Sequence, residues 1–141
     1  MKLQTAKTML NYAKQYMDLG QLKVVQTDED WIYVPNYNAI GVAENTTKEE
    51  IIWQEWMIGY IKDTFDYDIA LEHMEIFSLF HELGHHMRGD ICTNEEYNML
   101  VQELEDDDAY GYRQIPDEKV ADTFAIDFLK EHMNNLLELN K

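Results

Sequence analysis

The residues best suited to chemistry lie in one short segment near the middle of the chain. His81 and His85 are four positions apart, and Glu82 directly follows the first histidine. On a helix, positions i and i+4 lie on one face about one turn apart, so both imidazoles can bind one metal ion. Zinc is the expected ion, because it is a Lewis acid that lowers the pKa of a water molecule toward neutrality. Glu82 can then take a proton from water and pass it to a leaving amine, which predicts a metalloprotease.

A catalytic zinc ion usually has three protein ligands, and the sequence offers a third. A further histidine shortly after the motif is typical of metzincins, but residues 86–91 place neither their glycine nor their third histidine correctly, which excludes that family. The other option is Glu118, near the start of a predicted helix, with Asp122 one turn later on the same face. We expect Glu118 to bind the metal and Asp122 to accept a hydrogen bond from the far nitrogen of a ligand imidazole. The alternative is that Glu118 is an ordinary first-turn acid, stabilised by the helix dipole.

The residues around the motif indicate that its helix is largely buried. Phe77, Leu79, Phe80 and Leu83 surround the two histidines and the glutamate. Burial of such polar groups is costly unless they have partners, which supports a metal site. The alternative is a pair of core histidines satisfied by ordinary hydrogen bonds.

Five other residues are candidates for chemical roles. His86 projects about 100° away from the ligand pair around the helix, which makes it a poor ligand. Tyr110, Tyr112 or His132 could stabilise the oxyanion of a tetrahedral intermediate, and their spacing selects none of them. Cys92 lies in a polar stretch with no basic neighbour to lower its pKa, so we interpret it as an incidental thiol.

The sequence resembles the ImmA/IrrE-type zinc metallopeptidases. The resemblance rests on Phe80–His85, followed about thirty residues later by the pattern Glu118-x-x-Ala121-Asp122-x-Phe124-Ala125, and it is good from Phe77 to Leu129. It implies that His81, His85 and Glu118 bind Zn²⁺ and that Glu82 is the general base. The family often has asparagine where this chain has Asp122.

The resemblance also implies a substrate. Family members include phage and mobile-element proteins that cleave or inactivate helix-turn-helix repressors, so we expect a basic DNA-binding protein as the target. The chain has 28 acidic and 11 basic residues, for a net charge of −17, which is compatible with a basic partner. The same charge disfavours direct binding of nucleic acid or of an anionic membrane, although it also serves simply to keep a protein soluble.

Hydrophobic periodicity and turn residues predict the elements that position these groups. We expect a mostly helical α+β fold: one domain over residues 1–141, with a small antiparallel sheet and a zincin-like, gluzincin-type metal-binding helix. The expected helices cover residues 3–17, 47–61, 69–87, 94–105 and 116–139, and the expected strands cover 22–25, 31–34 and 39–43. Trp53 and Trp56 are interpreted as core residues, with the lining of a substrate cleft as the alternative. A single cysteine, no signal peptide and no long apolar stretch predict a soluble cytoplasmic protein.

Two functions follow from these patterns. The first is a zinc endopeptidase of narrow specificity that acts on a regulatory protein. The second is an acidic binding or inhibitor protein that sequesters a nucleic-acid-binding protein, with a structural or vestigial zinc site. Glu82 favours the enzyme, because a structural site has no use for a glutamate beside the metal.

Overall fold

The computed structural model describes residues 1–106 and 108–139. Its elements are α1 (Leu3–Ala13), β1 (Lys23–Thr27), β2 (Ile32–Val34), η1 (Pro35–Tyr37), β3 (Ala39–Ala43), α2 (Lys48–Phe65), η2 (Leu71–His73), α3 (Met74–Arg88), α4 (Asn94–Glu103), α5 (Ala109–Gln114) and α6 (Pro116–Glu138). The predicted fold class, mostly helical α+β with a small sheet, is confirmed. The predicted span of the domain, residues 1–141, includes residues outside the described part and stays a prediction.

The three strands form one mixed sheet in the order β1-β3-β2. Antiparallel pairing is confirmed for β2 with β3, but the prediction is wrong for β1 with β3, which pair in parallel. After β1 the chain forms β2 at the opposite edge of the sheet. It then turns at η1, so that β3 lies between β1 and β2. Asn38 ends that turn in the left-handed conformation, with φ of 47°. The alternation of apolar residues is the same for both pairing directions, so the sequence pattern did not distinguish them.

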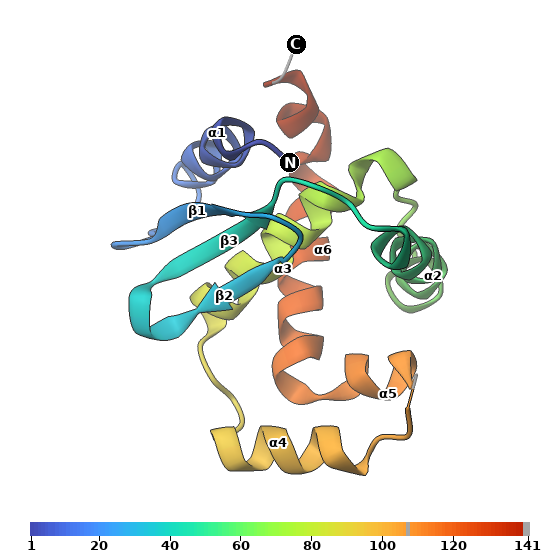
Figure 1. Ribbon diagram of the computed structural model, residues 1–141. Coiled ribbons are helices and arrows are strands. Elements are labelled where there is room, and N and C mark those ends of the chain that lie inside the picture. The colour runs from blue at the N-terminus through green and yellow to red at the C-terminus, as the bar shows by residue number, and fades with distance from the viewer. Residues whose placement is uncertain (107, 140–141) are drawn as a thin grey trace.

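Helices α3 and α6 cross in the centre of the molecule, with α3 also contacting β2 and β3 (Figure 1). The core between them contains Phe77, Phe80 and Leu83 of α3 and Ile126 and Leu129 of α6. These positions recur at helical spacing, which gives each helix a continuous apolar face. The predicted burial of the metal-binding helix is confirmed, since ten of its residues are buried.

The helix boundaries follow local capping chemistry. The Thr47 side chain accepts a hydrogen bond from the Glu50 amide, 3.0 Å away, and so begins α2. Gly89, with φ of 69°, ends α3, and Pro116 occupies the first turn of α6. Helix α5 was not predicted; it begins where Asp108 accepts a hydrogen bond from the Gly111 amide.

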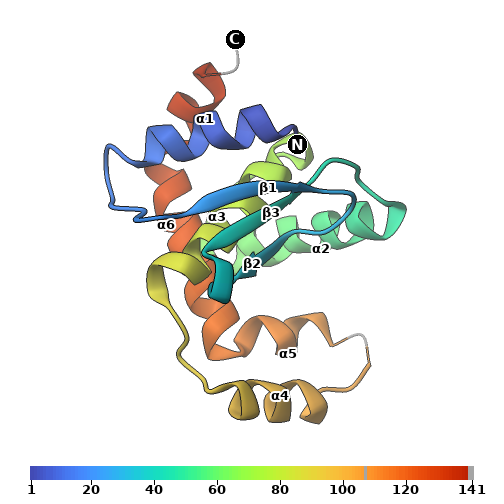
Figure 2. The same cartoon turned by 60° about the vertical axis from the view of Figure 1, so that its left-hand side comes forward.

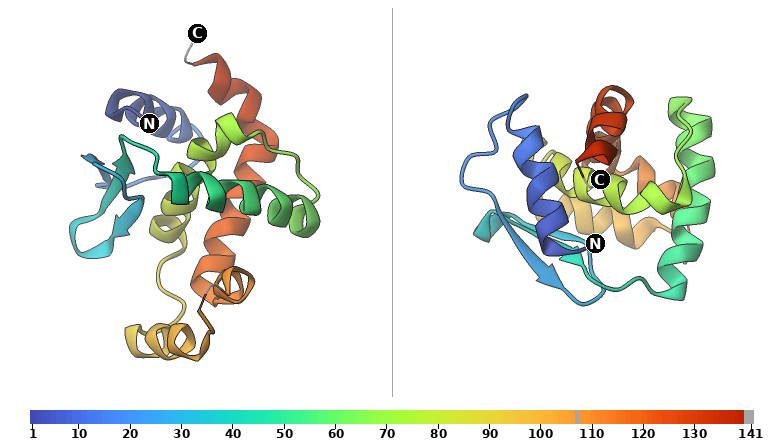
Figure 3. Two further views of the ribbon diagram at one scale, coloured as in Figure 1. Left: turned by 45° about the vertical axis from the view of Figure 1, so that its right-hand side comes forward. Right: turned by 90° about the horizontal axis from the view of Figure 1, so that it is seen from above.

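Helix α4 lies at the edge of the molecule, next to α5 and away from the sheet (Figures 2 and 3). A capping box between Thr93 and Glu96 stabilises its start. None of its residues is buried. Among the described residues, no helix is both long and apolar enough to span a membrane.

Candidate metal centre

The close crossing of α3 and α6 brings the candidate ligands together. A Cβ atom built on Gly84 would lie 2.9 Å from both the Cα and the carbonyl oxygen of Ala121. Only a glycine on α3 and a small residue on α6 permit this approach. His81 and His85 lie on either side of Gly84 along α3, and Glu118 lies one turn before Ala121 on α6. The crossing therefore places the carboxylate opposite the two imidazoles.

His81, His85 and Glu118 form a group whose ligand atoms all lie within 4.8 Å of one another. The two Nε2 atoms are 3.2 Å apart. Glu118 Oε2 lies 3.0 Å from His85 Nε2, and Glu118 Oε1 lies 3.7 Å from His81 Nε2. With bonds of about 2.0–2.1 Å, neighbouring ligand atoms around a tetrahedral zinc ion are roughly 3.3 Å apart. The three separations fit that geometry.

An unsatisfied atom in the group also fits a metal. Glu118 Oε2 is buried and accepts no hydrogen bond from any described residue, although it is close to His85 Nε2. Glu118 Oε2 and His85 Nε2 are therefore close together, but their orientation does not allow a hydrogen bond. A buried carboxylate oxygen without a donor is costly, and a cation bound between the three side chains would satisfy it. The donor set of two imidazole nitrogens and one carboxylate oxygen is one that zinc accepts.

Asp122 and Arg113 fix the orientation of the His81 ring from the side opposite the other ligands. His81 Nδ1 lies 2.8 Å from Asp122 Oδ1, so Nδ1–H is the donor there, and Nε2, which faces the other ligands, is the nitrogen that can bind a metal once its proton is lost. Arg113 binds the same carboxylate with two hydrogen bonds, of 2.9 Å from Nε and 2.6 Å from an Nη. Asp122 and Arg113 are 0% and 4% exposed. The structure thus places Asp122 where the sequence predicted it, in contact with a candidate ligand and not in the ligand group.

Burial and charge shift the pKa values of the group in opposite directions. Burial lowers the pKa of His81, but its hydrogen bond to Asp122 and the nearby carboxylates of Glu118 and Glu82 outweigh that effect and raise the pKa to about 10. Burial raises the pKa of Glu118, but contact with His81 and His85 outweighs it and holds the pKa well below its usual range. A proton on His81 thus balances the Glu118 carboxylate wherever no metal ion does so.

Glu82 lies beside the group, where two cavities meet. Its Oε1 is 4.0 Å from His81 Nε2, and burial raises the pKa of its carboxyl above the usual range. Each cavity has a volume of about 320 Å³, and both are lined by Glu82, Glu118, Trp31 and Tyr112. We call the two together the metal-site cleft. Among the described residues, no fourth Asp, Glu, His or Cys joins the ligand group, which leaves the metal position open toward this cleft.

Of the three candidates for stabilising an oxyanion, the structure brings only Tyr112 to the centre. Its hydroxyl lies 3.2 Å from Glu118 Oε1 and 2.7 Å from the hydroxyl of Tyr97. Burial and the charge of Glu118 raise the pKa of Tyr112, so the phenol stays protonated and can donate a hydrogen bond. Tyr110 is 62% exposed and packs on Tyr60. His132 is hydrogen-bonded to Tyr12, about 21 Å along α6 from Glu118 at 1.5 Å per residue.

The chain matches no protein-family model, no curated protein and no solved structure. The buried group of His81, His85 and Glu118 is consistent with a zincin-like site, and it rests on the geometry of this chain. Membership of the ImmA/IrrE-type family stays a resemblance carried by the motifs.

His86 and Cys92 lie outside the candidate ligand group. His86 lies between the Tyr33 hydroxyl and the Leu19 carbonyl, each 2.8 Å from a ring nitrogen, so its ring holds α3 against the sheet and the loop that precedes it. The Cys92 amide donates a hydrogen bond of 3.0 Å to Asp117, and burial raises the pKa of its thiol. A thiol with a raised pKa is a poor nucleophile.

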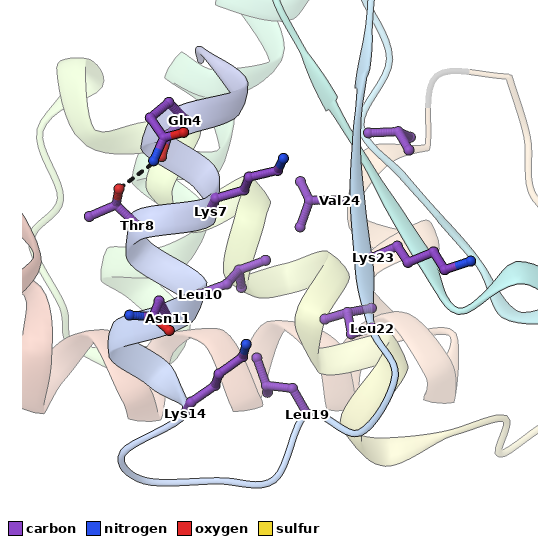
Figure 4. Close-up of a pocket in the computed structure, with 11 residues that line it drawn as sticks. Gln4, Lys7, Thr8, Leu10, Asn11, Lys14, Leu19, Leu22, Lys23 and Val24 are labelled. Atoms are coloured by element: carbon purple, nitrogen blue, oxygen red, sulfur yellow. Dashed lines mark hydrogen bonds between the residues drawn. The ribbon is translucent and has the colours of Figure 1, made fainter.

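A separate cavity of about 680 Å³ lies between α1 and β1 (Figure 4). Lys7, Lys14 and Lys23 stand around its apolar floor, which includes Leu10 and Val24. The described residues that line it include none of the candidate ligands and no acidic residue. This cavity is therefore not part of the metal centre.

Sequence reasoning missed Arg113 and Tyr97 and misjudged two tryptophans. Arg113 was detectable in principle, because it is the sole basic residue between Arg88 and Lys119. Tyr97 had no such signal. The interpretation of Trp53 and Trp56 as core residues is wrong for Trp56, which is 38% exposed, and incomplete for Trp53, which packs on the core and also lines the cleft.

Proposed function

We propose that this chain is a zinc-dependent endopeptidase of narrow specificity that cleaves or inactivates a basic DNA-binding regulator, such as a phage or mobile-element repressor. The observation that carries the proposal is a three-ligand group with one open side and with Glu82 beside it in the same cleft. A structural zinc site takes four protein ligands and leaves no position for a substrate. Three ligands beside a carboxylate are an arrangement suited to zinc-dependent peptide hydrolysis.

Each residue of the centre has a distinct task in the proposed reaction. Zinc, when bound, supplies a Lewis acid that polarises the peptide carbonyl and lowers the pKa of water. Glu82 accepts a proton from the attacking water and delivers it to the amide nitrogen as the C–N bond breaks. Tyr112 donates a hydrogen bond to the carbonyl oxygen as negative charge develops there. Asp122 and Arg113 keep the Nε2 lone pair of His81 directed at the metal.

The charge of the cleft supports a basic substrate. Glu29, Asp30 and Glu50 line the cavity next to His81, together with Trp31 and Trp53. Arg113 also reaches this cavity, but its charge is balanced by Asp122. Carboxylates beside tryptophan faces suit the long cationic side chains of lysine and arginine. The net charge of −17 favours encounter with a cationic protein.

A second function, sequestration of a basic protein without cleavage, is favoured by helix α4. The helix carries Glu95, Glu96 and Glu103, and none of its residues is buried. Such a surface can bind a cationic partner whether or not the centre is catalytic. Cleavage is what separates the two functions.

The experiment is a digest of a peptide library prepared from a whole bacterial proteome, with new N-termini identified by mass spectrometry. The native protein loaded with zinc is compared with Glu82→Gln and with a sample treated with a chelator. The proposal predicts new termini in a small set of basic peptides, produced by the native protein alone. If the zinc-loaded native protein yields the same termini as Glu82→Gln, from the library and from intact basic DNA-binding proteins, sequestration is the better account.

A further inference from the structure

An apolar groove runs between α2 and the segment from α4 to α5, with a volume of about 630 Å³. We call it the α2–α4 groove. Its floor contains Ile52 and Trp56 of α2, Val101 of α4, and Leu104. Ile52 is 68% exposed, Trp56 is 38% and Val101 is 37%. Contiguous exposed apolar side chains of this size mark interaction sites in soluble proteins.

The rim of the α2–α4 groove is acidic. Glu49 lies on the α2 side, and Glu105, Asp106 and Asp108 lie on the opposite side. Among the described residues that line the groove, only Arg113 is basic, and it is 4% exposed and bound to Asp122. The groove therefore combines an apolar floor with uncompensated negative charge, which complements a partner that is apolar on one face and cationic around it.

The groove adjoins the metal-site cleft. Trp53, Tyr112 and Arg113 line both of them. Helix α4 also reaches both, because Val101 lines the groove while Asn94 and Tyr97 line the cleft. A polypeptide held in the groove is thus a short distance along its chain from a segment at the metal centre.

We infer that the α2–α4 groove is a docking site for a basic amphipathic helix of the protein substrate. This helix is a segment of the substrate separate from the peptide bond that is cleaved. A helix lying between α2 and α4 presents apolar side chains at helical spacing to the floor, and its flanking lysines and arginines meet the acidic rim. The identity of the occupant as a substrate rests on the proposed function; the chemistry of the groove does not. Docking at this site explains how a small centre selects a single protein, because recognition is carried by surface beyond the cleft.

The test uses the Glu82→Gln protein, which cannot cleave, and a fluorescein-labelled synthetic helix of about 14 residues, or four turns, with leucine on one face and lysine on the other. A matched peptide has glutamate in place of each lysine. Affinity is measured by fluorescence anisotropy for the parent, for Ile52→Asp and for the pair Glu105→Lys with Asp106→Lys. The control pair, Glu55→Lys with Asp63→Lys, makes the same charge change at exposed positions of α2 outside the groove.

The inference predicts that both groove variants weaken binding of the lysine peptide by about tenfold or more, that the control pair changes it less than about threefold, and that the glutamate peptide does not bind. Equal weakening by the groove and control pairs, or equal binding of both peptides, would overturn it. So would a dimer of the native protein in sedimentation that Ile52→Asp dissociates, since the groove would then hold a second copy. If the native protein cleaves no substrate but the groove still binds the lysine peptide, the proposed function is wrong and the docking site stands. If the native protein cleaves a substrate and the groove variants cleave it equally well, the proposed function stands and the docking site is wrong.

Discussion

Gly84 of α3 and Ala121 of α6 contact each other backbone to backbone, at a separation that leaves no room for a Cβ on the glycine. His85 and Asp122 are the next residues on the two helices. The contact therefore fixes the spacing between the histidines and Glu118, and it gives a physical reason for the glycine in one motif and the alanine in the other. Ala121 is 1% exposed, so the helices cannot separate without disturbing the core.

Gly84→Ala is expected to destabilise the protein and to weaken zinc binding. The added methyl group meets the backbone of Ala121 at 2.9 Å, and overpacking of this kind costs about 1–3 kcal/mol. Forcing α6 away also moves Glu118 from the imidazoles, so zinc affinity should fall by about tenfold or more. Gly59→Ala is the matched control, because it also lies within a helix and a Cβ there meets nothing within 4 Å. That variant should gain up to about 1 kcal/mol. Equal stability and zinc affinity of the two variants in thermal denaturation and chelator competition would contradict the role of the contact.

The buried pair of Arg113 and Asp122 should show strong coupling in stability. Arg113→Met removes the counter-charge of a carboxylate that is 0% exposed, and loss of one partner of a buried pair costs about 3–5 kcal/mol. The double variant Arg113→Met with Asp122→Asn should recover part of that loss, because neither position then carries a charge that has lost its partner. Urea denaturation of the two single variants and the double variant measures the coupling. Additive effects would show that the two residues act independently.

Tyr112→Phe should lower kcat by about 10²- to 10³-fold, with KM and zinc content nearly unchanged. The reason is that the phenol donates to charge that develops only in the transition state. Tyr97→Phe removes the hydrogen-bond partner of Tyr112 and leaves the donor, so a decrease of less than about tenfold is expected. The rates are measured on a peptide from the library digest. A loss of zinc in Tyr112→Phe, or equal effects of the two variants, would assign Tyr112 a structural role.

Zinc affinity should rise with pH. In the metal-free protein the pKa of His81 is raised from 6.5 to about 10, so zinc must displace a proton throughout the neutral range. Loss of one proton predicts about a tenfold gain in affinity for each pH unit, measurable by chelator competition. The sign for stability is opposite. A pKa that is raised in the folded state stabilises the metal-free protein below about pH 6.5, and this stabilisation is lost as the pH rises toward about 10. A zinc affinity independent of pH would show that His81 is already neutral.

The sequence predicted most helices and the grouping of His81, Glu82 and His85, because both depend on local spacing. His81, Glu82 and His85 are joined by one helical turn, and Thr47 and Gly89 bound their helices through local chemistry. The pairing direction of β1 and β3 was not predictable in this way, because it depends on the path of the chain between them. Arg113 and Tyr97 were missed for a related reason. Arg113 lies on the short helix α5 and Tyr97 on the exposed helix α4, and tertiary contacts bring both helices to the metal centre. No periodic pattern in the sequence predicts those contacts.

The most direct test of the metal centre is elemental analysis of the purified native protein, Glu118→Ala and Glu82→Gln after incubation with zinc and removal of free metal. The account predicts close to one zinc ion per native chain, a marked loss in Glu118→Ala and full retention in Glu82→Gln, because Glu118 is a ligand and Glu82 is not. The absence of zinc from the native protein, or equal zinc in the native protein and Glu118→Ala, would contradict it.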